Sequence, residues 1–375
     1  MLEHDEKEQS VMSIKKILVF CLAAMVAIVM TGCGGQKDTT SSSSGAAKGI
    51  KVGVSMPTKS LQRWNQDGSN MEAKLKEKGY DVDLQFAENK VEVQASQIEN
   101  MITKGAKVII VGAIDGGALS SVLDEAKSAG VQVIAYDRLI MNTDAVSYYA
   151  TFDNYGVGKI QGEYIETKLG LKEGKGPYNF EIATGPLDDN NVVFFFKGAM
   201  DVLQPYIDQG KLVVKSGQVT REQCATPNWD EAKAQERMDN IITSHYTSDK
   251  IDAILCSNDS VSLGVQSALK SAGYGSEGKA MPIITGQDAN ISNVKAILAG
   301  EQSMSVFKDT RALADQVVEM VEAIVNGKEP EVNDTKTYNN GKKVVPSYLL
   351  QPQFVDISNY KKLLIESGYY KESDL

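Results

Sequence analysis

Short apolar runs alternate with longer amphipathic stretches along most of this chain. In its first half, four apolar runs are typical of strands buried in a parallel sheet, at 50–56, 82–86, 108–112 and 131–136. The stretches between them have the periodicity of amphipathic helices, at 64–78, 91–104 and 119–129. A glycine follows each of these helices and suits a left-handed C-cap. The pattern predicts strand–helix units wound into a parallel sheet.

The same pattern restarts in the second half of the chain. Strands are predicted at 180–184, 212–215, 251–256, 282–285 and 303–307, and helices at 191–203, 229–244, 260–272, 291–298 and 311–326. About 325 residues follow the N-terminal segment, more than one hydrophobic core usually supports. We therefore expect an α/β protein with two doubly wound parallel-sheet lobes.

The N-terminal segment has the order of features that secretion requires. Lys15 and Lys16 precede an apolar run at 17–30, which is short for a permanent membrane span and suits a signal peptide. The segment Met30-Thr31-Gly32-Cys33 then resembles a bacterial lipobox, so Cys33 is the expected lipidation site. The prediction is a leader at 1–32 and a flexible tether at 33–48, with an uncleaved anchor helix as the alternative.

The first eleven residues of this leader carry several acidic side chains, the wrong charge for the start of a signal peptide. We therefore expect the true start to be Met12, with Met1 as the alternative. The formal charge of −10 disfavours nucleic acid as a partner. Of the four cysteines, only Cys224 and Cys256 lie beyond the leader and the lipobox. Buried free thiols are favoured over a bridge between them.

Polar side chains stand where the predicted strands end. In open α/β sheets, ligands bind beyond the carboxyl ends of the strands. The residues there are Arg63 and Trp64, Asp137 and Arg138, Asp189 and Asn191, Asn258, Asp288 and Lys308, with Trp229 at the start of a predicted helix. Carboxylate, amide and guanidinium groups suit the hydroxyls of a sugar, and the aromatic faces suit its C–H surfaces.

Each of these residues also has a purely structural interpretation. Asn191, Asp259 and Asp288 precede predicted helices and could serve as N-caps. Arg63 and Lys308 could be solvated surface charges, and Trp64 could belong to the core. The run 194–196 of phenylalanines fits a core-facing helix better than the wall of a binding site.

No motif for catalysis or cofactor binding stands in the sequence. A Gly-x-Gly-x-x-Gly fingerprint is absent after the first strand, and His245 has no partners for metal ligation or nucleophile activation. Asp188 and Asp189 are adjacent, whereas glycoside hydrolysis needs carboxylates on opposite sides of a bond. We expect no catalytic residues, no cofactor and no metal.

Longer motifs make the chain similar to the type I, ribose-binding-like solute receptors of ABC transporters, and most of all to their xylose-binding and multiple-sugar branches. The resemblance covers residues 49–375. It rests on Ser96-Gln97-Ile98-Glu99-Asn100-Met101, Ala135-Tyr136-Asp137-Arg138, Asp189-Asn190-Asn191, Gly286-Gln287-Asp288-Ala289, Val345-Pro346-Ser347-Tyr348-Leu349-Leu350 and Gly368-Tyr369-Tyr370-Lys371-Glu372-Ser373.

The resemblance implies a ligand site and a hinge. The family's contacts fall on Arg63, Trp64, Asp137, Arg138, Asp189, Asn191, Trp229, Asn258, Asp288 and Lys308, with Lys59 less securely placed. An N-terminal lobe is expected at 49–153 plus 309–342 and a C-terminal lobe at 154–308 plus 343–375. The hinge crossings are expected near Asp153, Lys308 and 342–346.

The implied function is binding of a monosaccharide, xylose or another aldose, by a monomeric lipoprotein outside the cytoplasm that serves an ABC transporter permease. A sugar receptor that feeds a chemoreceptor or a sensor kinase is the alternative, and a receptor for a furanose signal molecule is a further one. A transcriptional repressor with this fold would need a basic helix-turn-helix where this chain carries its leader.

Overall fold

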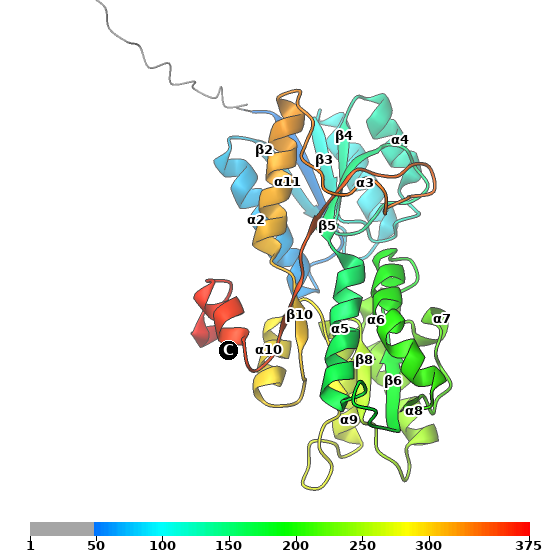
Figure 1. Cartoon of the computed structure of the whole chain (residues 1–375). Helices are drawn as coiled ribbons and strands as arrows, with labels where there is room; N and C mark the ends of the chain where they lie inside the picture. The colour runs from blue at the N-terminus through cyan, green and yellow to red at the C-terminus, as the bar shows by residue number, and fades with distance from the viewer. Residues whose placement is uncertain (1–48) are drawn as a thin grey trace, which may run out of the picture. The chain divides into compact units, whose positions relative to one another are not determined.

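The computed structural model describes residues 49–375 (Figure 1). The leader, the tether and Cys33 lie outside the described residues, so the predictions made for them stay predictions. In the part that is described, no helix is both long and apolar enough for a membrane span. Cys224 and Cys256 are both free and buried, which confirms the prediction of unbridged thiols.

The first sheet has six parallel strands in the order β11-β5-β4-β3-β1-β2. Their bounds are β1 Lys51–Met56, β2 Asp81–Phe86, β3 Val108–Val111, β4 Gln132–Tyr136, β5 Val146–Phe152 and β11 Ser347–Leu350. Alternate residues of each strand face opposite sides, so Ile109 and Val111 join one core while Val108 and Ile110 join the other.

Two helices cover each face of this sheet. One face packs α2 (Gln62–Glu77) and α11 (Thr310–Val325), and the other packs α3 (Val91–Thr103) and α4 (Ser120–Ser128). The long helix α11 lies beside α2 although the two are far apart in the sequence (Figure 1). This double cover explains why the strands are apolar on both sides.

The second sheet has four parallel strands in the order β7-β6-β8-β9. Its strands are β6 Tyr178–Ala183, β7 Leu212–Val213, β8 Ala253–Cys256 and β9 Ile283–Ile284, and a separate antiparallel pair joins β10 Ser305–Phe307 to β12 Gln353–Val355. Its helices are α5 Asn154–Leu169, α6 Asn191–Asp208, α8 Glu231–His245, α9 Asp259–Ser271 and α10 Ile291–Leu298. Short helical turns are α7 Arg221–Cys224, η1 Pro227–Trp229, η2 Lys361–Glu366 and η3 Glu372–Asp374.

The predicted α/β class with two parallel sheets is confirmed, and the strands β5, β11 and β12 and the helices α5 and α7 are added to the predicted list. Strand β5 and helix α5 follow one another at 146–169. Helix α5 carries Gly156, Gly158 and Gly162, which weaken its apolar periodicity. The predicted helix start at Trp229 is wrong, because this residue lies in η1 with a φ of 57° and helix α8 begins at Glu231.

The chain passes between the two sheets three times. It leaves the first sheet after Phe152, returns after Phe307, and leaves again after Leu350. The third crossing was expected at 342–346, and this is wrong because Ser347–Leu350 pairs in parallel with β5. Residues 343–350 therefore belong with the first sheet rather than with a lobe that contains 343–375.

Candidate functional site

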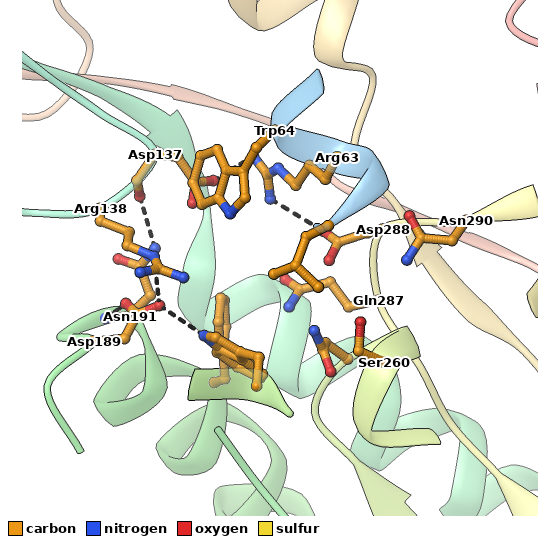
Figure 2. A pocket seen from close by; sticks show the side chains of 14 residues that line it. Arg63, Trp64, Asp137, Arg138, Asp189, Asn191, Ser260, Gln287, Asp288 and Asn290 are labelled. Atoms are coloured by element: carbon orange, nitrogen blue, oxygen red, sulfur yellow. Dashed lines mark hydrogen bonds and ion pairs between the residues drawn. The ribbon is translucent and has the colours of Figure 1, made fainter. Parts of the chain in front are cut away.

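The carboxyl ends of both sheets open onto one pocket with an empty volume of about 430 Å³, part of it open to solvent. Figure 2 shows side chains from both halves of the fold pointing into it. Of the ten residues predicted for the ligand site, nine line this pocket: Arg63, Trp64, Asp137, Arg138, Asp189, Asn191, Trp229, Asn258 and Asp288. The tenth residue, Lys308, lies 2.9 Å from Asp288 through its ammonium group.

Arg63 is the centre of a buried ion cluster. On the first turn of α2, its Nε lies 3.0 Å from Asp67 and its Nη1 lies 3.0 Å from Asp288, while Nη2 pairs with Asp137. Burial alone would lower the pKa of Arg63, but the three carboxylates raise it well above its usual value. Burial would raise the pKa of Asp288, yet Lys308 and Arg63 hold it below the usual value.

These contacts decide between the two interpretations of Arg63 and Lys308. Both are buried, at 7% and 3% exposure, and both bind carboxylates, so they are not solvated surface charges. A buried cation persists only with such partners. The cluster therefore holds its charged groups in fixed directions at the edge of the pocket.

Arg138 is fixed in a similar way from the end of β4. Its Nη1 donates hydrogen bonds of 3.1 Å to the carbonyl groups of Ala113 and Ile114. Its Nε lies 3.0 Å from Asp189 Oδ2, and its guanidinium carbon lies 5.1 Å from the centroid of the Trp64 ring. Trp64 is only 3% exposed and packs with the core, as its structural interpretation predicted, and it also lines the pocket.

Asp189 lies just before helix α6 and Asn191 is its first residue, and both join the two halves of the fold. Asp189 accepts hydrogen bonds from the Asn191 backbone N–H at 3.0 Å and from Trp229 Nε1 at 3.2 Å. Asn191 Nδ2 donates to the Asp137 carbonyl oxygen at 2.7 Å, and the Tyr149 hydroxyl lies 2.6 Å from the same oxygen. Asn191, which follows β6, thus fixes the backbone of Asp137, which follows β4, by a hydrogen bond.

The backbone is strained at three residues that line the pocket. Asp137, Trp229 and Asp288 have φ angles of 61°, 57° and 98°, a region that side-chain-bearing residues seldom adopt. Such strain clusters where a fold holds side chains in functional directions. Gly185 serves the same end, because a Cβ there would overlap the indole ring of Trp229.

The structure shows which polar residues at the strand ends cap the helices that follow. Asn258 caps helix α9, since its Oδ1 accepts a hydrogen bond from the Val261 N–H at 2.9 Å, and it also lines the pocket. Asp259, Asp288 and Asn191, the three candidate caps, do not occupy N-cap positions. In the phenylalanine run, Phe195 lines the pocket, whereas Phe194 and Phe196 pack away from it.

Sequence reasoning missed part of the pocket wall. The additional residues are Leu61, Ser260, Gln287 and Asn290. Gln287 stands beside Asp288 in the motif already quoted, which was the one available signal. Lys59 does not line the pocket, and its ammonium lies 5.1 Å from the Phe86 ring.

Two buried polar atoms on the pocket wall have no hydrogen-bond partner among residues 49–375: Gln287 Oε1 and Asn290 Oδ1. Buried polar atoms are nearly always paired, so these two are suited to receive a polar ligand. Within the same range, no three or more His, Cys, Asp or Glu side chains lie close enough together to hold a metal ion.

Known proteins resemble this chain over almost the whole of its described length. A family model for a periplasmic binding protein domain matches residues 52–329. The multiple sugar-binding periplasmic receptor ChvE of Rhizobium radiobacter is 55% identical over 324 residues, which cover 86% of this chain and 92% of that protein. The D-xylose-binding periplasmic protein of Escherichia coli (strain K12) is 37% identical over 329 residues, which cover 88% and 93%.

A solved structure agrees with these matches. It is an ABC transporter solute-binding protein from Clostridium phytofermentans with bound β-D-glucose, 61% identical, with a TM-score of 0.84 and coverage of 87% of this chain and 99% of that one. These relatives are solute receptors and not enzymes. Sequence, fold and site geometry together show that the chain belongs to the periplasmic binding protein family.

Proposed function

We propose that this chain binds a neutral aldose in the pocket between its two sheets and delivers it to the permease of an ABC transporter. Glucose and xylose are the first candidates, because relatives at 61% and 37% identity carry β-D-glucose or bear the name of D-xylose. The lipobox at Cys33 supports attachment of the chain to the outer face of the cell membrane.

One observation carries the proposal: polar groups of fixed direction and two tryptophans line the same pocket. Carboxylates accept hydrogen bonds from sugar hydroxyls, guanidinium groups donate to them, and the flat indole faces suit the C–H surfaces of the ring. Closure around the sugar would remove water from these groups and pair them with the ligand.

The charge balance favours a neutral ligand. The three cations, Arg63, Arg138 and Lys308, are each paired with a carboxylate in the pocket, and Asp67 adds a fourth carboxylate behind them. An anionic sugar would enter a site with no unpaired cation to receive its charge. We therefore expect a uronate to bind more weakly than the aldose of the same size.

A melting-shift titration of the full chain with glucose, xylose and galacturonate tests the function. At a sugar concentration a hundred times Kd, binding adds about 2.7 kcal/mol to the free energy of unfolding, so Tm should rise by several degrees with an aldose. Arg138→Met should raise Kd at least about tenfold, because it removes a buried donor but leaves Asp189 its two other partners.

Lys197→Met is the matched control, since it removes a cation from the exposed face of α6 and should leave Kd unchanged. If neither aldose shifts Tm, the proposed function is wrong. If Arg138→Met binds as tightly as the original chain, the site is misplaced.

A further inference from the structure

The C-terminal segment reaches both halves of the fold through Tyr370. Its ring is buried in a small core with Val294 of α10 and with Phe307 and Val355 of the antiparallel pair. The backbone N–H of Tyr370 donates to the Leu364 carbonyl group at 2.8 Å. Figure 1 shows this segment beside α10. The ring of Tyr370 is thus anchored on the half that contains the second sheet.

The hydroxyl of Tyr370 uses all its hydrogen-bonding capacity at the boundary between the halves. It donates to the Ala289 carbonyl oxygen at 3.0 Å. It accepts from Gln62 Nε2 at 3.0 Å and from Gln66 Nε2 at 3.4 Å, and both of these residues belong to α2 on the first sheet. The amide oxygen of the same side chain, Gln62 Oε1, accepts a hydrogen bond from the Ile291 N–H at 3.2 Å.

Two of the three partners of this hydroxyl, Gln62 and Ala289, are neighbours of residues in the candidate ligand site. Gln62 precedes Arg63, and Ala289 follows Asp288, whose carboxylate lies 3.0 Å from Arg63 Nη1. Ala289 has a φ of 51° and Asp288 one of 98°, so this loop needs support from its surroundings. Two separate interactions therefore connect α2 with the loop at 288–289: the hydrogen bonds from Gln62 through Tyr370 to Ala289, and the ion pair between Arg63 and Asp288.

We propose that Tyr370 is a positioning residue that ties closure of the ligand pocket to the C-terminal segment. It touches no ligand, but it holds α2 and the Asp288 loop in the relative position that Arg63 and Asp288 need. The inference rests on the proposed function, because its readout is sugar affinity.

A double-mutant cycle with Tyr370→Phe and Gln62→Met, in the full chain titrated with glucose, tests this role. Each substitution removes one side of the hydrogen bond and keeps the volume of the side chain. We expect each to raise Kd about three- to thirtyfold, mainly through faster dissociation. The double variant should raise Kd by less than the product of the two single effects, because both remove the same link.

Tyr155→Phe is the matched control, since it removes a hydroxyl that bonds to Asp201 within one half of the fold, and it should leave Kd unchanged. Unchanged affinity in Tyr370→Phe, or independent effects of the two substitutions, would overturn the inference. A purely structural role would lower the Tm of the sugar-free chain without changing Kd. An original chain that binds no sugar would instead refute the proposed function, and this inference with it.

Discussion

Single aspartates in this protein differ because their neighbours differ. Asp288 lies between two cations, which hold its pKa below the usual value despite burial. Burial raises the pKa of Asp67 to about 6, even though Arg63 opposes the shift. Asp259 is fully buried with neutral donors only, so burial, together with the nearby Asp288, raises its pKa to about 8. The balance between burial and the number of nearby cations, two for Asp288, one for Asp67 and none for Asp259, therefore sets the direction and size of each pKa shift.

Asp259 should make the stability of the fold depend on pH. Its folded-state pKa exceeds the unfolded value, so the folded chain binds the extra proton between about pH 4 and pH 8. The contribution of Asp259 is fully present below about pH 4 and is lost as pH rises towards 8. Relative to Asp259→Asn, the free energy of unfolding should therefore fall with rising pH, by at most about 1.4 kcal/mol per pH unit.

Urea unfolding of both chains at pH 5, 6, 7 and 8 measures this difference. The substitution also disturbs bonds from the Asn290 N–H at 2.8 Å and from Ser305 Oγ at 2.8 Å, but that cost is the same at every pH. A difference between the two chains that stays constant over this range would contradict the assignment.

At the scale of elements, the second half depends on helices that approach closely. Helices α5 and α6 cross where Gly158 meets the Phe195 carbonyl group and Gly198 meets the Tyr155 carbonyl group, and a Cβ at either glycine would overlap that oxygen. This contact positions the start of α6, which carries Asn191. The glycines that weaken helical periodicity are therefore the residues that permit the packing.

Gly198→Ala should lower the free energy of unfolding by about 1–3 kcal/mol, because the added methyl group pushes two backbones apart. Urea denaturation at fixed pH measures the loss. Lys197→Ala, next to it on the exposed side of α6, should change stability by no more than about 0.5 kcal/mol. Equal effects of the two substitutions would show that the close crossing is unimportant.

At the scale of the whole molecule, the chain crosses between the two sheets three times within residues 49–375, and the polar pocket lies where the carboxyl ends of the two sheets meet. Because the connections are few, the halves can rotate relative to one another. The ion pair between Arg63 and Asp288 and the hydrogen bonds of Tyr370 hold the halves together. A bound sugar would add hydrogen bonds to both sides and shift the population towards the closed form.

Glucose should therefore reduce the radius of gyration of the chain in solution, as measured by small-angle X-ray scattering. The same sugar concentration should leave the radius of Arg138→Met unchanged, because that variant binds too weakly to be saturated. A radius that does not respond to saturating glucose in the original chain would contradict closure.

Most of the fold could be predicted from the amino-acid sequence, because strand–helix units give a strong local pattern of apolar and polar residues. Apolar runs of strand length and amphipathic stretches with terminal glycines located most elements within a few residues. Nine of the ten residues proposed for the site line one pocket, since the ends of parallel strands converge at one edge. Local pattern failed at β5, at the glycine-rich α5 and at Trp229, where packing between distant segments outweighs periodicity.

Chain order and residue type therefore account for the α/β class, the two parallel sheets and the polar character of their carboxyl ends, because these depend on neighbours in the sequence. Folding in three dimensions determines which charges pair, since Arg63 meets Asp288 from 225 positions away. It also determines that the strand Ser347–Leu350 joins the first sheet and that Tyr370 reaches α2. Long-range contacts of this kind leave no periodic trace along the chain, because they depend on where entire elements pack.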